Sequence, residues 1–192
     1  MKKIISLFER NWETDNKIRN EVTKGAEWVV AGEGIATRKY DGTACLIKDG
    51  KLFKRYDVKK GRKQPDGFIP AQDPDPTTGH WPGWVPCDRN NPSDKYHWEA
   101  FDSLFTQITS EKTDGTYELL GPKVQGNPEH FPDAHVLLKH NKIPAIEPDP
   151  PRDFDGLKEY FKGKDIEGIV WHHPDGRMVK IKKRDFGMNR ID

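Results

Sequence analysis

Short apolar runs separated by polar turns recur along this chain, and most of them predict β-strands. Residues 43–47 and 52–56 are two such runs, on either side of Lys48-Asp49-Gly50-Lys51. Asp-Gly between two strand-like runs predicts a β-hairpin, because both turn residues must adopt positive φ. We expect further strands at residues 28–30, 35–37, 116–120, 136–138, 166–171 and 178–183, and a strand or short helix near residues 4–8 that leads into a polar connection.

Two longer stretches have helical periodicity, and one has none. Residues 98–109 and 154–162 carry apolar side chains at helical spacing, which predicts two amphipathic helices. Residues 59–94 hold much of the proline and glycine, which predicts an irregular excursion rather than core elements. We expect Trp81 and Trp84 to anchor this excursion, and the alternative is that they cover a substrate groove.

Length and cysteine usage narrow the class of protein. The chain has 192 residues, enough for one well-buried core and short for two domains. Its apolar runs are far shorter than the ~20 residues that span a bilayer, so we expect no membrane partner. Cys45 and Cys87 are the only cysteines and have neither metal-site spacing nor a disulfide framework. We therefore expect a cytoplasmic protein whose thiols are buried or inert.

Charge is segregated along the chain although the formal net charge is only +1. Residues 38–63 contain ten Lys or Arg against three Asp, and residues 177–190 contain six against Asp185 alone. These segments carry +7 and +5, so the remainder carries −11. Either segment alone is typical of a solvated strand or loop. Together they favour a basic face that meets a polyanion.

Four short patterns place charged groups where a strand alone does not need them. Lys39 stands two residues before an Asp-Gly, which by itself is typical of a surface lysine beside a turn. Glu118 interrupts an apolar strand, where an unpaired carboxylate is costly, and a ribose hydroxyl pair or a lysine could be its partner. Glu167 heads another apolar strand. Lys180 and Lys182 share one face of a strand and repel unless an anion lies between them.

In this order, the patterns resemble motifs I, III, IV and V of the covalent nucleotidyltransferases, which include ATP-dependent ligases and GTP-dependent mRNA capping enzymes. The four are Lys39-x-Asp41-Gly42, Tyr117-Glu118-Leu119-Leu120-Gly121, Glu167-Gly168-Ile169-Val170 and Lys180-x-Lys182. Each is weak alone, but four in order across nearly the whole chain form a specific signal. Within this superfamily, the chain most resembles the small ATP-dependent 5′-3′ RNA ligases. Two features favour them: the sequence Tyr-Glu-Leu-Leu-Gly-Pro-Lys, and the end of the chain ten residues beyond Lys182.

The resemblance implies a role for each position. Lys39 would attack the α-phosphate of ATP and hold AMP through a phosphoramidate, while Lys180 and Lys182 would grip that phosphate. Glu118 would accept hydrogen bonds from the ribose, and Glu167 would coordinate the catalytic Mg²⁺ or Mn²⁺. The implied nucleotide-binding set also contains Thr37 (backbone contacts to adenine), Asp41 (orienting metal-bound water or the RNA 3′ end), Gly42, and Arg55 with Lys54 as its rival (phosphate or ribose).

Elementary chemistry supports this interpretation. A free lysine has a pKa of ~10.4, so very little of it is neutral and nucleophilic at pH 7. Cationic neighbours such as Lys180 and Lys182, and a nearby Mg²⁺, would disfavour the ammonium form of Lys39. The same cations would stabilise the charge that develops on the phosphoryl oxygens. AMP would then pass to an RNA 5′-phosphate, and an RNA 3′-hydroxyl would displace it and seal the strand.

The resemblance also implies a fold and a substrate. The fold would be α+β, with antiparallel β-sheets around a nucleotide cleft and flanking helices, as in the ligase and ATP-grasp-like group. We expect one nucleotidyltransferase domain over residues 1–192, without a C-terminal OB-fold, that acts as a monomer on RNA with 3′-OH and 5′-phosphate ends. Two alternatives stay open: a GTP-dependent capping-type or DNA nick-sealing enzyme, and a nucleic-acid-binding relative without turnover.

Overall fold

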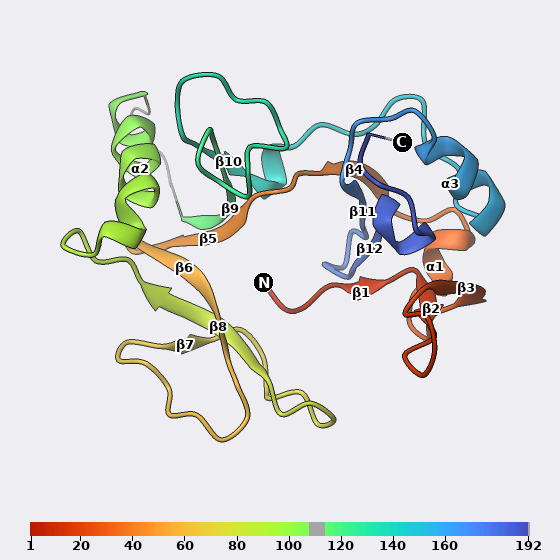
Figure 1. The fold of residues 1–192 in the computed structure, drawn as a ribbon, viewed down its shortest axis with the longest axis horizontal. Helices are drawn as coiled ribbons and strands as arrows, with labels where there is room; N and C mark the ends of the chain where they lie inside the picture. The colour runs from red at the N-terminus through yellow and green to blue at the C-terminus, as the bar shows by residue number, and fades with distance from the viewer. Residues whose placement is uncertain (108–113, 192) are drawn as a thin grey trace. The chain divides into compact units, whose positions relative to one another are not determined.

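The computed structural model describes residues 1–107 and 114–191, and the chain divides into two compact units (Figure 1). The first unit comprises Met1–Lys3 and Asp41–Lys142, and the second comprises Ile4–Tyr40 and Ile143–Asp192. Both combine helices with sheets whose described strands pair antiparallel, except for the parallel pair of β1 and β12. The predicted α+β class is therefore confirmed. That the chain is a single nucleotidyltransferase domain stays a prediction.

The second unit is built on a four-stranded sheet in the order β1-β12-β11-β4. Strand β11 pairs antiparallel with both β12 and β4. Strands β2 and β3 pair antiparallel with each other and form a separate two-stranded sheet. The elements of this unit are β1 (Ile5–Ser6), β2 (Phe8–Arg10), β3 (Ile18–Val22), α1 (Glu27–Val30), β4 (Ile35–Lys39), α3 (Phe154–Phe161), β11 (Gly168–His172), β12 (Met178–Lys182) and the 3₁₀ turn η3 (Lys183–Phe186).

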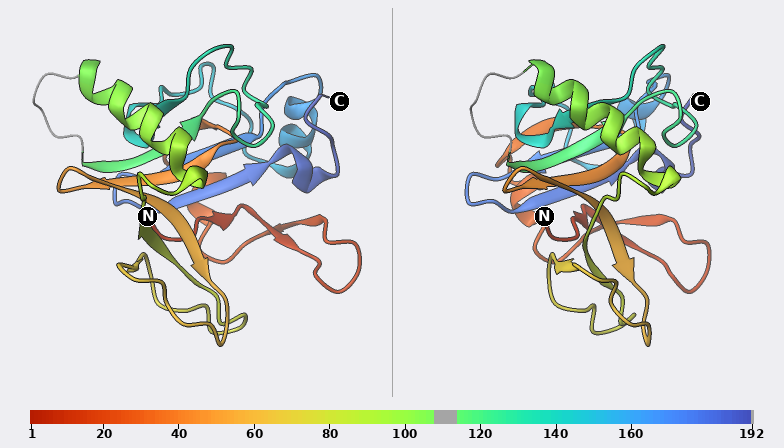
Figure 2. Two further views of the ribbon diagram at one scale, coloured as in Figure 1. Left: turned by 60° about the vertical axis from the view of Figure 1, so that its left-hand side comes forward. Right: turned by 90° about the vertical axis from the view of Figure 1, so that its left-hand side faces the viewer.

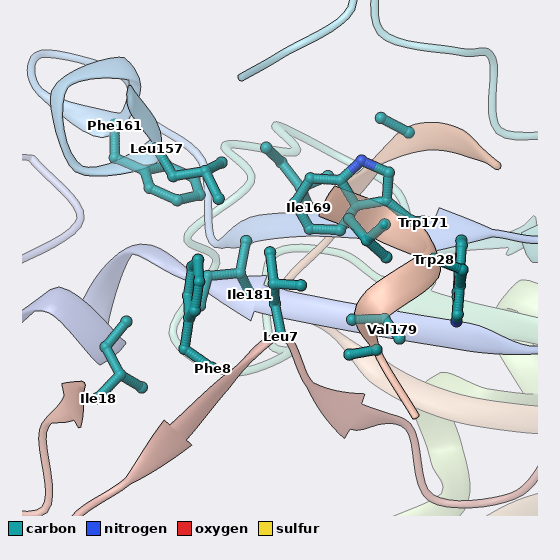
Figure 3. Close-up of a cluster of buried hydrophobic side chains, with 13 residues drawn as sticks. Leu7, Phe8, Ile18, Trp28, Leu157, Phe161, Ile169, Trp171, Val179 and Ile181 are labelled. Carbon is teal, nitrogen blue, oxygen red and sulfur yellow. The ribbon is translucent and has the colours of Figure 1, made fainter. Parts of the chain in front are cut away.

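An apolar core covers one face of this sheet. Its members include the side chains labelled in Figure 3: Leu7, Phe8, Ile18, Trp28, Leu157, Phe161, Ile169, Trp171, Val179 and Ile181. On β12, Val179 and Ile181 are buried in this core, and Lys180 and Lys182 alternate with them. Because successive strand residues point to opposite faces, both lysines lie on the face away from the core. The predicted alternation along this strand is confirmed.

The first unit contains a six-stranded antiparallel sheet in the order β10-β9-β5-β6-β8-β7. The predicted hairpin is formed by β5 and β6, and its turn residues Asp49 and Gly50 have φ values of 51° and 69°. Cys45 and Cys87 are buried in the core of this unit, as expected. The elements are β5 (Thr43–Lys48), β6 (Lys51–Val58), β7 (Ile69–Pro70), β8 (Trp81–Pro86), η1 (Pro92–Asp94), α2 (Lys95–Gln107), β9 (Gly115–Leu120), β10 (Val136–Lys139) and η2 (His140–Lys142).

Both predicted helices are confirmed. Helix α2 begins three residues before the predicted start, and the predicted positions 108 and 109 lie outside the described residues. It crosses the strands of its own unit (Figure 2) and packs on them through Trp98, Phe101 and Leu104. Asp153 caps α3 by accepting the Gly156 N–H at 2.8 Å. Over the described residues, no helix has the length and apolar character needed to cross a membrane.

One predicted strand is wrong, because the run Trp28-Val29-Val30 is a helical turn, α1. A short apolar run fits a buried helix segment as well as a strand, so periodicity alone cannot assign it. Glycines with φ of 91° and 92° at positions 25 and 32 redirect the chain on both sides of the run. A single turn of helix is then enough to bury Trp28 and Val29.

The excursion at residues 59–94 is more regular than predicted, since it contains β7 and β8. Strand β8 pairs with β6 along its whole length, and its proline residues are tolerated because only the two-residue β7 pairs with its other edge. Trp84 is buried, and Trp81 Nε1 donates to the Gln72 carbonyl at 2.6 Å. Both tryptophans therefore anchor this segment, as favoured. In the second unit, β3 likewise occupies the predicted polar connection.

Candidate active site

Lys39 is the last residue of β4, and the strand register brings it close to Lys182. Gly168 of β11 pairs with Lys39 on one side and with Lys182 on the other. A Cβ atom on Gly168 would lie 2.1 Å from the carbonyl oxygen of Ile181, so only glycine allows the strands to approach this closely. Glu167 directly precedes this glycine, and its carboxylate lies between the two lysine side chains.

The Glu167 carboxylate bridges the two lysines. Its Oε2 lies 2.5 Å from Lys39 Nζ, and its Oε1 lies 2.5 Å from Lys182 Nζ. The three side chains are mostly buried, with Glu167 only 10% exposed. Burial alone would raise the pKa of Glu167, but the two ammonium groups outweigh it and hold that pKa below its usual value. The glutamate is thus an anion held by two cations.

Lys180 adds a third cation to this cluster. It makes no ion pair with any residue that the structure describes, although Glu167 and Asp185 lie near enough to favour its charged form. Burial, followed by the charges of Lys182 and Lys39, lowers the pKa of Lys180 to about 8. Two of the three lysines are therefore paired with one carboxylate and the third is not, which leaves this site with an excess of positive charge. We call Lys39, Glu167, Lys180 and Lys182 the lysine cluster.

Thr37 shares a face of β4 with Lys39 and is buried. Its hydroxyl donates to the carbonyl of Val170 at 3.3 Å and lies 2.9 Å from His172 Nε2. These bonds tie the strand that carries Lys39 to β11. That the Thr37 backbone contacts adenine stays a prediction.

A buried aspartate in η3, the turn that follows β12, holds the backbone of Lys182 in place. The Asp185 carboxylate accepts the backbone N–H of Lys182 at 2.9 Å and forms an ion pair with Arg10. From the sequence, Asp185 was predicted only to lower the charge of its basic segment. One sequence signal could have indicated this role. Asp185 is the single acidic residue of a basic stretch and lies three residues after Lys182, a spacing at which a short side chain can cap a helical turn.

Lys183 is a second residue that sequence reasoning missed. Its side chain is 1% exposed, and its Nζ donates to the carbonyls of Lys164 and Arg190 at 2.9 and 2.8 Å. Its backbone N–H donates to the Glu167 carbonyl at 2.9 Å. A fully buried lysine looks the same as its exposed neighbours in a basic run, so the sequence held no signal for it.

Glu118 lies in the first unit and has a partner that the sequence did not predict. Its Oε2 lies 2.9 Å from His140 Nε2, and His140 Nδ1 lies 2.9 Å from Thr116 Oγ1. The partner in this structure is therefore a histidine and not the lysine proposed as one alternative. The pairing of β9 with β10 brings His140, which follows β10 directly, to this place. Contact of Glu118 with a ribose stays a prediction.

Asp41 and Gly42 also lie in the first unit. The backbone N–H of Asp41 donates to Glu129 Oε1 at 2.9 Å. A Cβ atom on Gly42 would lie 2.3 Å from the Leu119 carbonyl oxygen, so this glycine is required for close packing against β9. Across the described residues, no group of three or more His, Cys, Asp or Glu side chains could hold a metal ion.

The two basic candidates that follow the hairpin turn are engaged within the first unit. Arg55 donates to the Met1 carbonyl at 2.7 Å and lies over the Trp84 ring, 4.9 Å from its centre. Lys54 Nζ lies 2.5 Å from Asp94 Oδ1. Of the predicted site residues, the structure brings Lys39, Glu167, Lys180 and Lys182 together, with Thr37 on the same strand as Lys39. Glu118, Asp41, Gly42 and Arg55 belong to the other unit.

Comparison with known proteins gives one consistent family. A family model described as RNA ligase 1 matches residues 101–191, a stretch that includes Glu118, Glu167, Lys180 and Lys182. RNA ligase 1 of Danio rerio is 30% identical to this chain, that of Pongo abelii 27% and that of Rattus norvegicus 26%. Each match covers 80% of this chain and 67% of the relative. The chain belongs to the RNA ligase 1 family.

Proposed function

We propose that this protein is an ATP-dependent RNA ligase that works through a covalent adenylate on Lys39. The observation that supports it best is the lysine cluster, in which three ammonium groups face one buried carboxylate. Like charges this close are unfavourable unless an anion binds among them. The phosphates of ATP are such an anion, and membership of the RNA ligase 1 family supports RNA as the chain that receives the adenylate.

In the first step, Lys39 Nζ would attack the α-phosphorus of ATP. The P–N bond forms as the bond to the bridging oxygen of the β-phosphate breaks, pyrophosphate leaves, and the protons of the amine pass to water. Lys180 and Lys182 would hold the α-phosphate oxygens, where negative charge builds up in the transition state. Lys39, Lys180 and Lys182, which would carry out this step, all belong to the second unit.

Lys39 must lose its contact with Glu167 before it can attack. The carboxylate lies 2.5 Å from Lys39 Nζ and holds this nitrogen in an ion pair, so the nitrogen cannot approach a phosphorus atom until that contact breaks. The same glutamate would therefore keep Lys39 inactive when no nucleotide is bound.

Two further steps would complete the joining. A 5′-phosphate oxygen of RNA attacks the phosphorus of the adenylate, the P–N bond breaks, and the Lys39 nitrogen takes up protons again. A 3′-hydroxyl oxygen of RNA then attacks that 5′-phosphate and its proton passes to water. The phosphoanhydride bond to AMP breaks, AMP leaves, and a phosphodiester bond remains. Glu118, whose carboxylate contacts His140, would accept hydrogen bonds from the ribose hydroxyls of the adenylate.

The donor set fits a metal ion that arrives with the nucleotide better than a resident one. Glu167 is the carboxylate that pairs with Lys39 and Lys182, and no group of three or more His, Cys, Asp or Glu side chains among the described residues could hold a metal ion. Mg²⁺ commonly binds through one or two carboxylates and fills its other positions with water and substrate phosphates. Glu167 would hold Mg²⁺ or Mn²⁺, with Asp41 as the further candidate, and the ion would supply positive charge to the phosphate oxygens.

Labelling with radioactive ATP tests the adenylate directly. Wild-type protein with ATP labelled at the α-phosphate and Mg²⁺ should retain label after denaturation, and Lys39→Ala should retain none. Lys51→Ala is the matched control, because Lys51 is an exposed lysine in the hairpin of the other unit. Equal labelling of Lys39→Ala and wild type would refute the nucleophile. Label from GTP instead of ATP would favour a capping-type enzyme.

The joining step needs its own measurement. RNA strands with 3′-OH and 5′-phosphate ends should become a longer product on a denaturing gel, and matched DNA strands should not. Preference for nicked DNA would favour the nick-sealing alternative. A protein that binds RNA but takes no label and joins nothing would be a binding relative without turnover.

A further inference from the structure

The two basic segments of the chain use their charges differently. In residues 177–190, the charged side chains are mostly occupied within the second unit: Arg177 pairs with Asp175, Lys182 with Glu167 and Arg190 with Asp165, and Lys183 is buried. In residues 38–63, Lys39 pairs with Glu167, Lys54 pairs with Asp94, and Arg55 donates to the Met1 carbonyl. Of the exposed cations that remain in these segments, four are concentrated in one place, and Lys48, Lys51 and Arg184 lie elsewhere.

That place is the turn after β6, which carries Lys59, Lys60, Arg62 and Lys63. All four are exposed, and none forms an ion pair with any residue in the described part of the chain. Arg62 N–H donates to the Lys59 carbonyl at 3.0 Å, and Gly61 within this turn has a φ of 75°. The turn therefore gathers four unpaired cations into five consecutive residues. We call them the basic turn.

An aromatic hollow begins where the basic turn ends. Its volume is about 580 Å³, within the range of small-molecule sites, and it is lined by residues 62–68 and Trp81. The rings of Phe68 and Trp81 meet edge to face, with centres 5.5 Å apart. Asp66 is the one acidic residue of its lining, so cations and rings dominate. Figure 1 shows this segment in gold and olive, around β7.

The hollow is held in shape by the chain around it. Strand β7 pairs with β8, Phe68 N–H donates to the Pro65 carbonyl at 3.2 Å, and Trp81 Nε1 donates to Gln72. Two acidic residues beyond the hollow have partners of their own: Asp57 Oδ2 lies 3.1 Å from His80 Nδ1, and Asp75 forms an ion pair with Lys3. Rings fixed in place lose little conformational freedom when a ligand binds to them.

We propose that the basic turn and the hollow of Phe68 and Trp81 form a binding surface for single-stranded RNA. Unpaired cations hold the phosphates, and the aromatic rings receive unstacked bases, the combination that single-strand binding surfaces use. A duplex keeps its bases stacked on one another and so cannot fill an aromatic hollow. The proposal rests on the proposed function, because it names where the first unit holds the RNA strand to be joined.

Binding of a fluorescent 12-nucleotide single-stranded RNA, measured by anisotropy at several salt concentrations, tests this surface. The variant with Lys59, Lys60, Arg62 and Lys63 all changed to alanine should bind at least about tenfold more weakly near 0.1 M salt. Its plot of log affinity against log salt should be flatter by about 3, at roughly 0.7 per lost phosphate contact. The matched control changes four other exposed lysines of the same unit to alanine: Lys48, Lys51, Lys123 and Lys142. Equal losses in both variants would overturn the proposal.

Two further measurements test the role of the aromatic rings and distinguish a failure of the RNA-binding surface from a failure of the proposed adenylate on Lys39. Phe68→Leu should weaken binding of the RNA about tenfold and leave binding of polyphosphate unchanged. Equal binding of a 12-base-pair RNA duplex, or no effect of Phe68→Leu, would overturn the assignment to unstacked bases. All variants should still take up ATP label on Lys39, which also shows that they are folded. Normal labelling with unchanged RNA binding refutes the surface alone, whereas loss of labelling in wild type refutes the proposed function.

Discussion

Single side chains decide the charge balance at the lysine cluster. Glu167 satisfies Lys39 and Lys182 with its two oxygens, and Lys180 is left with the lowered pKa. Lys180 is therefore the cation of the cluster that has no ion pair among the described residues, and we expect an anion that enters the site to pair with it. Its charge state should control how tightly the phosphates of ATP bind.

The pH dependence of ATP binding should follow Lys180. Below a pKa of about 8 its ammonium form predominates and attracts phosphate, and above it the neutral amine does not. The KM for ATP in Lys39 labelling should therefore rise about tenfold between pH 7 and pH 9, the change expected for loss of one proton with this pKa. Lys180→Arg keeps its charge over this range and should give a nearly flat profile. Matching slopes in the two proteins would show that a group other than Lys180 causes the change.

The lysine cluster could be predicted from the sequence, but the partners of several residues could not. Lys39, Glu167, Lys180 and Lys182 are named by short motifs in a fixed order, and the structure places them together. The partner of Glu118 depends on the register of two strands and on the turn after β10, so no local pattern points to His140. Arg55 follows the expected spacing, yet it contacts Met1, a residue 54 positions away.

Secondary structure was predictable where a turn or an alternation fixed it. The Asp49-Gly50 hairpin and the β12 alternation are set by local chemistry, namely positive φ and burial on one face. The run at residues 28–30 has neither signal, and β8 is a strand only because β6 pairs with it in spite of its prolines. In both cases tertiary contacts overrode the local pattern.

The 3₁₀ turn η3 should depend on the buried lysine at its start. Lys183→Met would leave the carbonyls of Lys164 and Arg190 without their donor, at a cost of about 1–3 kcal/mol in the free energy of unfolding. Urea denaturation measures this loss. Arg184→Met is the control, because Arg184 is the next residue and is exposed, so it should change stability by less than about 0.5 kcal/mol. Equal effects of the two changes would contradict the role given to Lys183.

Considered as a whole, the molecule keeps a net charge of +1 while it concentrates positive charge in two places, for which we propose different tasks. The lysine cluster of the second unit is partly buried and suited to a nucleotide, and the basic turn of the first unit is exposed and suited to a strand. The sequence located both basic segments. It could not distinguish them, because only the fold shows which charges are paired or buried.

RNA that already carries a 5′-adenylate should separate these two tasks in one assay. Lys39→Ala protein should join such RNA to a 3′-OH strand although it takes no label from ATP, because the proposed mechanism makes and breaks the bond to Lys39 in earlier steps. The four-alanine variant of the basic turn should show the reverse: normal label from ATP, and joining of the adenylated single strand about tenfold slower at RNA concentrations below saturation. Product formation on a denaturing gel gives both rates, and the variant of Lys48, Lys51, Lys123 and Lys142 serves as the control. If folded Lys39→Ala protein, judged by its circular dichroism, cannot join adenylated RNA, then Lys39 also acts in the last step and is more than the nucleophile.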